Sequence, residues 1–432
     1  MTQSKLVEKK YLVPFIIVTS LFALWGFAND ITNPLVAAFR TIMEISNAKA
    51  ALIQLAFYGG YATMAIPAAL FVRKYSYKRA IILGLALYAT GALLFIPAAQ
   101  FEMFGFFLAS LYILTFGLAF LETTANPYIL SMGSEETSTR RLNLAQSFNP
   151  LGSIFGMFIA ANVILASLQS DLLNSNGELI FDTLSVAEKA AVRTHDLAVI
   201  RNPYVVLGLV VIGMIVLFLV AKMPNTRSEN PQSSVRSSFK RLLKNSIYRQ
   251  GVIAQVFYVG VQIMCWTFII HYAERLGLSK ADAQRYNMIA MGLFIIFRFV
   301  STFLMRFFNS RTLLMLFAIG GMLTIAGTIF MQGMGGLYCL VGTSAFMSLM
   351  FPTIYGISLE GIDEDTTLGA AGLVMAIVGG ALMPPLQGMI IDFEIIWGMP
   401  AVNISFVLPF ICFLVIARFG IVSRHLQMQT IN

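Results

Sequence analysis

The sequence has little charge and few of the residues that carry out covalent chemistry. Only 12% of its 432 residues are Asp, Glu, Lys or Arg, about half the share found in an ordinary soluble domain. The three cysteines, Cys265, Cys339 and Cys412, lie apart in apolar runs without a C-x-x-C pair, which argues against disulfides and a metal site. The three histidines are equally dispersed. These shortages argue against a membrane-embedded enzyme, and no cofactor is expected.

Apolar residues, by contrast, fill the chain in long runs. They make up 58% of the sequence, and a membrane-spanning helix needs about 20 of them to cross a hydrocarbon core about 30 Å thick. The sequence therefore predicts an all-α membrane protein with twelve transmembrane helices. The expected spans are 12–38, 50–72, 80–99, 103–131, 143–169, 203–222, 251–273, 286–305, 312–331, 335–358, 368–390 and 398–420.

The basic residues set the expected orientation. With the N-terminus inside, the inner segments hold about 20 of the 29 Lys and Arg residues, which is the bias expected of cytoplasmic loops. Both termini are therefore expected in the cytoplasm, and the protein in a bacterial inner membrane. The net charge of +8 is spread over short loops without interleaved aromatic residues, so nucleic acid is not expected as a partner. Membrane lipid is expected as a partner, and the chain is expected to be a monomer.

A polar stretch after the sixth span divides the chain. We expect a six-helix bundle at 1–222, a cytoplasmic linker with an amphipathic helix at 223–250, and a second six-helix bundle at 251–432. The halves share faint similarity, since Asn126-Pro127 precedes Glu135 as Phe351-Pro352 precedes Glu360. Two repeated bundles with a substrate site between them are a known transporter design.

The few ionisable residues inside the spans are candidates for function, because a charge at mid-bilayer costs about 3 kcal/mol or more. Glu122 lies near the middle of the fourth span, four residues before Asn126 and on the same helix face. It is the candidate proton-coupling acid. The second candidate proton-coupling acid is Asp30. It lies in the first span, beside Asn29 and three residues before Asn33.

Uncharged amides are the candidate sugar ligands, since they offer donors and acceptors to hydroxyl groups. Gln146 and Asn149 form an i, i+3 pair early in the fifth span. In the seventh span, Gln262 and Trp266 are four residues apart, and aromatic faces stack on sugar C–H surfaces. The predicted substrate-binding residues are Asn29, Asn33, Asn126, Gln146, Asn149, Gln262 and Trp266.

Basic residues near the inner surface form the predicted gate. Arg298 lies within the eighth span, two turns before Arg306, and a lone arginine there must be paired or hydrated. Arg73 and Lys74 follow the second span. We expect these four residues to latch the inner gate. The basic residues of the two loops are expected to engage helix C-termini and acidic partners such as Glu135, Glu136, Glu360 and Asp363; they are Arg73, Lys74, Lys78, Arg79, Arg306 and Arg311.

Several motifs resemble one transporter family. Trp25-Gly-Phe-Ala-Asn29, Leu121-Glu122-Thr-Thr-Ala-Asn126-Pro127 and Arg141-Leu-Asn143-Leu-Ala-Gln146-Ser-Phe-Asn149 are similar to motifs of the fucose–galactose–glucose:proton symporter branch of the major facilitator superfamily. The resemblance runs from about residue 11 to 420. It implies two pseudo-symmetric six-helix bundles, alternating access, Glu122 as a protonatable acid in the central cavity, and sugar contacts from Gln146 and Asn149.

The chain departs from this pattern at two places. The family's fucose carriers place an acid where this sequence has Asn33, so the acid has moved three residues toward the N-terminus, to Asp30. They also have a tyrosine where this chain has Phe351, which removes one hydrogen-bonding group.

Together, these features predict a secondary transporter that imports a monosaccharide, L-fucose first, by proton symport driven by the proton gradient. A glucose or galactose symporter is the first alternative. A drug or metabolite exporter is the more distant one, because its cavity would contain fewer amides.

Overall fold

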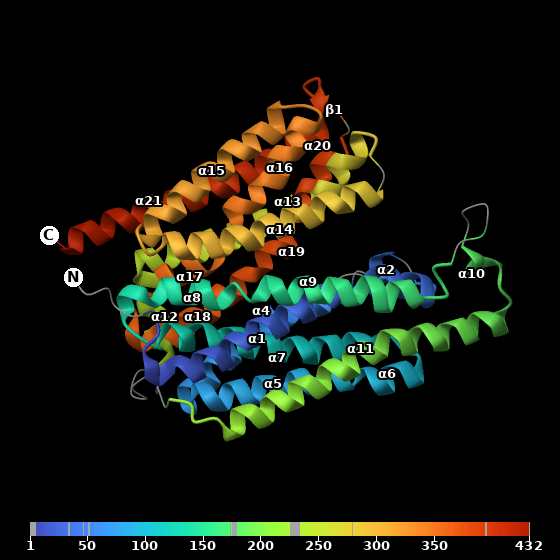
Figure 1. Ribbon diagram of the computed structural model, residues 1–432, viewed down its shortest axis with the longest axis horizontal. Helices are drawn as coiled ribbons and strands as arrows, with labels where there is room; N and C mark the ends of the chain where they lie inside the picture. Colours follow the sequence, from blue (N-terminus) through green and yellow to red (C-terminus); the bar gives the residue numbers. More distant parts are fainter. Residues whose placement is uncertain are drawn as a thin grey trace. The chain divides into compact units, whose positions relative to one another are not determined.

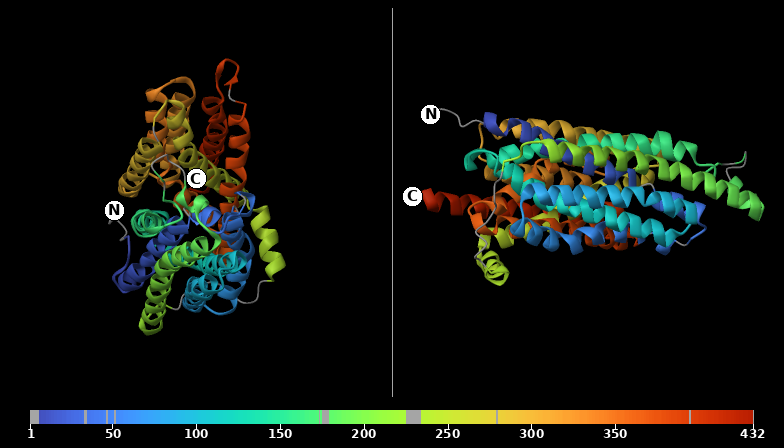
Figure 2. Two further views of the ribbon diagram at one scale, coloured as in Figure 1. Left: turned by 90° about the vertical axis from the view of Figure 1, so that its right-hand side faces the viewer. Right: turned by 90° about the horizontal axis from the view of Figure 1, so that it is seen from below.

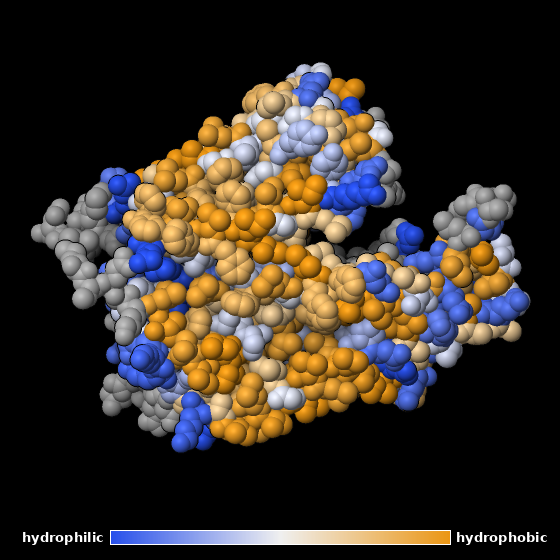
Figure 3. All heavy atoms as spheres, viewed as in Figure 1, coloured by the Kyte–Doolittle hydropathy of each residue, from blue (hydrophilic) through white to orange (hydrophobic). Residues whose placement is uncertain are grey.

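The computed structural model describes residues 6–32, 35–45, 47–50, 52–172, 174, 179–224, 234–278, 280–393 and 395–431. Within these residues, twelve helical segments are long and apolar enough to cross a membrane, which confirms the twelve predicted spans. On the face drawn in Figure 3, hydrophobic side chains cover most of the helix surfaces. This distribution is that of an integral membrane protein.

The chain folds into two compact units (Figures 1 and 2). Unit 1 contains Met1–Tyr11, Asn126–Ser147 and Ser228–Asn432, and unit 2 contains Leu12–Ala125 and Phe148–Arg227. A short piece of the first half of the sequence is therefore grouped with the second half. The predicted division at 222 and 250 stays a prediction, and linker residues 225–233 lie outside the described residues.

The helices of unit 2 include the first four spans and most of the fifth and sixth. They are α1 (Leu12–Thr32), α2 (Leu35–Ile42), α3 (Asn47–Ala50), α4 (Leu52–Lys74), α5 (Tyr77–Leu93), α6 (Phe95–Phe101), α7 (Phe104–Leu130, continuing into unit 1), α9 (Asn149–Ile159), α10 (Ile180–Thr183) and α11 (Val186–Val220).

Helices α1 and α9 approach each other closely because glycines face the contact. A Cβ atom on Gly152 would collide with the backbone of Ala23, and one on Gly156 would collide with the backbone of Phe27. Small residues four apart allow membrane helices to pack backbone to backbone. Span five is thereby fixed against span one.

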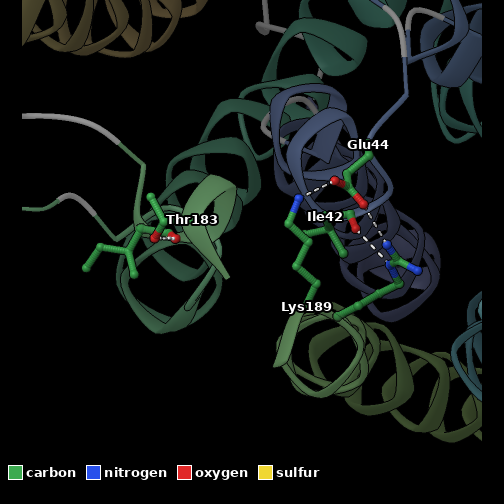
Figure 4. A network of polar contacts seen from close by, with 6 residues as sticks. Ile42, Glu44, Thr183 and Lys189 are labelled. Carbon is green, nitrogen blue, oxygen red and sulfur yellow. Dashed lines mark hydrogen bonds and ion pairs between the residues drawn. The ribbon is translucent and has the colours of Figure 1, made fainter. Parts of the chain in front are cut away.

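Helix α11 begins at Val186, well before the predicted start of the sixth span at 203. Charged residues interrupt the apolar residues of its first turns, but Ser185 and Glu188 form a capping box that fixes the start. In this extension Lys189 Nζ and Arg193 Nη2 contact the Glu44 carboxylate at 2.7 and 3.0 Å (Figure 4). The predicted span was therefore too short at its outer end.

The helices of unit 1 include the last six spans. They are α8 (Ser138–Gln146), α12 (Val235–Lys244), α13 (Ser246–Arg275), α14 (Lys280–Leu304), α15 (Ser310–Phe330), α16 (Met334–Met347), α17 (Met350–Leu359), α18 (Thr366–Met375), α19 (Gly379–Ile391), α20 (Ala401–Ser405) and α21 (Val407–Ile431). The outer hairpin pairs β1 (Ile395–Ile396) with β2 (Met399–Pro400). Helix α12 lies in the segment where the amphipathic helix was predicted.

Spans five and eleven repeat one backbone pattern. Each begins with a 3-10 turn, η2 (Glu135–Thr137) or η5 (Asp363–Asp365), and Thr137 and Asp365 share φ −101° and ψ 3°. Each span is then interrupted midway, after Gln146 or after Met375. The internal repeat predicted from the sequence is therefore visible in the backbone.

Candidate functional site

The two candidate acids lie on α7 and α1 of unit 2. Glu122 is 7% exposed and is surrounded along α7 by the fully buried Leu118, Leu121 and Ala125. Asp30 is half-buried on α1. Helix α4 supplies a tyrosine within electrostatic range of each acid, Tyr61 near Glu122 and Tyr58 near Asp30. A buried carboxyl group and phenol hydroxyls form a group of sites able to hold and exchange a proton.

The neighbours of Asp30 are only partly described. Asn29 is half-buried beside it on α1, whereas Asn33 lies outside the described residues. The predicted face shared by Asp30 and Asn33 therefore stays a prediction.

The fifth span is interrupted between its two predicted sugar ligands. Helix α8 ends at Gln146 and α9 begins at Asn149, with Ser147 and Phe148 in a turn. Gln146 and Asn149 therefore lie on two separate helices, and their expected i, i+3 pairing on one face stays a prediction.

Each amide instead has its own partner. In unit 2, Asn149 Nδ2 donates to the Phe22 carbonyl of α1 at 3.2 Å. In unit 1, Gln146 Nε2 donates to Asn126 Oδ1 at 2.9 Å, and both side chains are buried. Asn126 and Gln146 thus form one amide pair, which orients the remaining donors and acceptors of both side chains.

Arg298 of α14 is buried in unit 1 and is held by main-chain carbonyls. Its Nε donates to the Ser348 carbonyl at 2.6 Å and its Nη1 to the Gln146 carbonyl at 3.1 Å. The guanidinium also lies 4.7 Å from the centre of the Phe294 ring, a favourable cation–π geometry. Carbonyl dipoles and an aromatic face therefore stabilise this buried charge.

Trp266 continues this aromatic group on α13. Its ring meets that of Phe294 edge to face at 5.0 Å, and its Nε1 donates to Ser344 Oγ at 3.2 Å. Gln262, one turn earlier on α13, is half-buried. These contacts give this part of unit 1 an aromatic character.

Two further polar residues of α13 are fully buried. Both amide atoms of Gln255 and the hydroxyl of Tyr258 make no hydrogen bond within the described part of the chain. Gln255, Tyr258 and Gln262 recur at positions i, i+3 and i+7, so they share one helix face. Gln255 was not singled out from the sequence, although its spacing to Gln262 pointed to it.

The predicted gate residues have different surroundings. Arg73 is half-buried and Lys74 exposed, with its Nζ 5.4 Å from the Tyr75 ring centre. Arg306 is exposed, 5.9 Å from the Phe307 ring centre. The four gate assignments stay predictions.

Two contacts of the neighbouring basic residues match expectation. Arg311 Nη2 pairs with Glu360 Oε2 at 2.6 Å. Lys78 Nζ donates to the carbonyls of Leu219 and Ala221 at the C-terminus of α11, at 3.2 and 2.9 Å. Basic residues at this surface therefore engage both an acid and a helix end, as predicted. One pair was not predicted: Arg241 of α12 binds the Asp365 carboxylate at 2.7 Å.

Comparisons with known proteins agree with this arrangement. The model of the Major Facilitator Superfamily matches residues 17–384. The chain is 65% identical over 418 residues to the L-fucose-proton symporter of Haemophilus influenzae, over 96% of this chain and 98% of that protein. It is 28% identical over 419 residues to a glucose/galactose transporter of Brucella abortus, over 96% and 95%.

A solved structure is similar along the same length. It is that of FucP, a Major Facilitator Superfamily transporter in the outward conformation, with a TM-score of 0.87, 34% identity, and coverage of 96% of this chain and 99% of that one.

Proposed function

This chain belongs to the Major Facilitator Superfamily, and we propose that it imports L-fucose by proton symport. The observation that carries the substrate is the 65% identity to an L-fucose-proton symporter over nearly the whole of both chains. The observation that fits the proton is Glu122, a nearly buried carboxyl group in a membrane-spanning helix. An ionisable residue in such a place marks a functional site by default.

The proton step follows from the cost of burying charge. Glu122 takes up a proton, with Asp30 assisting, when sugar binds from outside. Protonation removes the carboxylate charge and with it the cost of closing an apolar environment around it. The carrier then opens inward, and sugar and proton leave. The proton gradient supplies the driving force, and no cofactor is required.

The sugar ligands are the amides and one aromatic face. Asn126 and Gln146 are joined by one hydrogen bond, and amide groups both donate to and accept from hydroxyl groups. Asn29, Asn33 and Asn149 add polar contacts. Trp266 supplies a flat apolar face for the sugar ring, with Gln262 beside it. Arg73, Lys74, Arg298 and Arg306 serve the inner gate.

The protein works as a monomer in the inner membrane, with both termini in the cytoplasm. The distribution of basic residues supports this orientation, because such residues concentrate on the cytoplasmic side. A glucose or galactose carrier is the second candidate, favoured by Phe351 where the family's fucose carriers have a tyrosine, and by similarity to a glucose/galactose transporter.

Counterflow of labelled L-fucose in proteoliposomes tests the substrate. We expect exchange that excess unlabelled L-fucose abolishes and that galactose and glucose reduce less. Exchange suppressed most by glucose or galactose would favour the second candidate. Absence of exchange with all three sugars would overturn the sugar assignment.

A further inference from the structure

Helix α12 is too short to cross a membrane and lies outside the twelve candidate spans. It has 10 residues, which span about 15 Å at 1.5 Å per residue, whereas the hydrocarbon core of a bilayer is about 30 Å thick. Within unit 1 it packs against α13 and α18. The helix therefore lies along the ends of membrane-spanning helices and not among them.

One side of α12 is fixed to unit 1. Ser238 and Leu242, four residues apart, are buried. Arg241 binds the Asp365 carboxylate through two hydrogen bonds, from Nε to Oδ2 and from Nη2 to Oδ1, each 2.7 Å long. A forked pair of this kind is specific in geometry as well as strong. It fixes the rotation of α12 about its own axis, and so determines which side chains point away from unit 1.

The outward side of α12 carries an apolar stripe beside a basic stripe. The apolar stripe is exposed and consists of Val235, Phe239 and Leu243. The basic stripe is exposed as well and consists of Arg236, Lys240 and Lys244. Residues four apart lie on one side of a helix, so each set forms a continuous row. Because each basic residue directly follows an apolar one, the two rows run next to each other.

This pair of stripes matches the surface of a bilayer with negative charge. A helix with an apolar row and adjoining Lys and Arg residues lies in the plane of the membrane, with the apolar side chains at the acyl-chain boundary. The long stems of Lys and Arg pack on apolar groups while their charges stay at the level of the headgroups. Among the described residues, the ion pairs of α12 involve Arg241 alone. The basic stripe therefore keeps its positive charge for anionic groups outside the chain.

We propose that α12 is a binding site for anionic phospholipid of the bilayer. The basic stripe binds the lipid phosphate groups, the apolar stripe enters the acyl-chain boundary, and the pair of Arg241 with Asp365 holds both stripes toward the bilayer. Lipid bound here holds the start of the seventh span at the membrane surface, because only Asn245 separates α12 from α13. The site is independent of the proposed sugar, and the proposed orientation places it at the cytoplasmic leaflet.

The test measures lipid preference at α12 directly. In full-length protein with Cys265, Cys339 and Cys412 replaced by serine, Phe239→Cys carries a fluorophore on the apolar stripe. Quenching by brominated phosphatidylglycerol is compared with quenching by brominated phosphatidylcholine in vesicles that contain both lipids. We expect both lipids to quench, and phosphatidylglycerol to be preferred by up to about fivefold for each basic residue of the stripe. The preference should fall as salt is added.

Two further variants separate a built site from general attraction of charge. Changing every residue of the basic stripe to Gln should abolish the preference for phosphatidylglycerol. The matched control changes three other exposed basic residues of α13 and α21 to Gln and should keep it; they are Arg249, Arg418 and Arg424. Circular dichroism of each variant checks that it is folded.

The variant Asp365→Asn tests the orientation of α12. It removes a negative charge beside the helix, so charge alone would raise the preference for phosphatidylglycerol. The proposal predicts a lower preference, because α12 loses the pair that sets its rotation.

Three results would overturn the proposal: equal quenching by the two lipids, an equal loss of preference in the basic-stripe variant and its control, or a raised preference in Asp365→Asn. Quenching by neither lipid would also overturn it, and would mean that polypeptide, from this chain or from a second copy, covers the stripes. Every measurement is made without sugar. Failure of the proposed substrate in counterflow would therefore leave the lipid site untouched.

Discussion

Spans five and eleven share a backbone design but differ in chemistry. Both start from a 3-10 turn with the same dihedral angles at its last residue, and both are interrupted midway. At the interruption, span five carries the amides Gln146 and Asn149, whereas span eleven carries Met375, Ala376 and Gly379. The repeat thus supplies two interruptions, and only that of span five carries amide side chains.

The two spans also differ in how they are held. Span eleven lies wholly within unit 1, whereas α8 and α9 of span five are divided between the two units. Span five is therefore shared by the two units, and span eleven is not. Span eleven, with the same break and no amide there, serves as an internal reference.

The largest effect is expected from removing the amide of span five. Gln146→Leu removes a proposed sugar ligand and leaves the buried Asn126 Oδ1 without its donor. One unmade hydrogen bond to a hydroxyl group costs about 1–3 kcal/mol, so we expect counterflow of L-fucose to fall about 10- to 100-fold.

The matched variant in span eleven is Gln387→Leu. Gln387 Nε2 donates to Ser405 Oγ at 3.0 Å, a contact internal to the fold. Its loss should lower stability by about 1 kcal/mol and leave counterflow within about twofold of the parent. Equal losses of transport in the two variants would break the comparison of the spans.

The fold was largely predictable because hydropathy reports burial in lipid. All twelve spans were found in this way. The N-terminal extension of α11 was missed because charged residues interrupt its first seventeen residues, and only the Ser185–Glu188 capping box marked its start. The interruption after Gln146 was also missed, although Pro150 signals it. Proline has no N–H group to donate to the Gln146 carbonyl four residues earlier, so it breaks the helix there.

The site was less predictable than the fold. Glu122 stood out because a carboxyl group inside a span is rare. The partner of Gln146 is Asn126, twenty residues away on another helix, and no spacing rule connects them. The partners of Arg298 are backbone carbonyls, which every residue offers, so the sequence cannot single them out.

A smaller effect is expected from crowding one face of α8. Gly356→Ala would press a methyl group on Thr139, whereas Gly342→Ala enters open space. Overpacking costs about 1–3 kcal/mol. We expect Gly356→Ala to slow L-fucose exchange about 5-fold to 100-fold if the contact returns in every cycle, and Gly342→Ala to leave it unchanged.

Thr139→Ala should partly restore exchange to Gly356→Ala, because it removes the two atoms that the new methyl group meets. The counterflow rates of the parent, the two single variants and the double variant give the coupling between Thr139 and Gly356. Additive losses would show that the two residues do not interact during transport.

The smallest effect concerns the outer end of unit 2, away from both interruptions. A hydrogen bond from Lys189 holds the pKa of Glu44 below its ordinary value. Because the pKa of Glu44 is lowered in the folded state, the contact stabilises the protein at pH values above the ordinary glutamate pKa of about 4.3. This stabilisation is lost as the pH falls through the pKa that Glu44 has in the folded protein.

Glu44→Gln should therefore lower the thermal unfolding temperature slightly at pH 7 and by less near pH 4. The contact is exposed, so the change should stay below about 1 kcal/mol, with counterflow unaltered. A large loss of transport would mean that the outer contact takes part in the cycle, and the contrast with span five would weaken.

The central claim is that Glu122 couples sugar movement to the proton. The most direct measurement compares L-fucose counterflow with uphill accumulation, driven by an imposed proton gradient, in proteoliposomes of the parent and of Glu122→Gln. Glutamine mimics the protonated carboxyl group, so the account predicts that counterflow is retained and accumulation is lost. Accumulation that persists at the parent level in Glu122→Gln would contradict it.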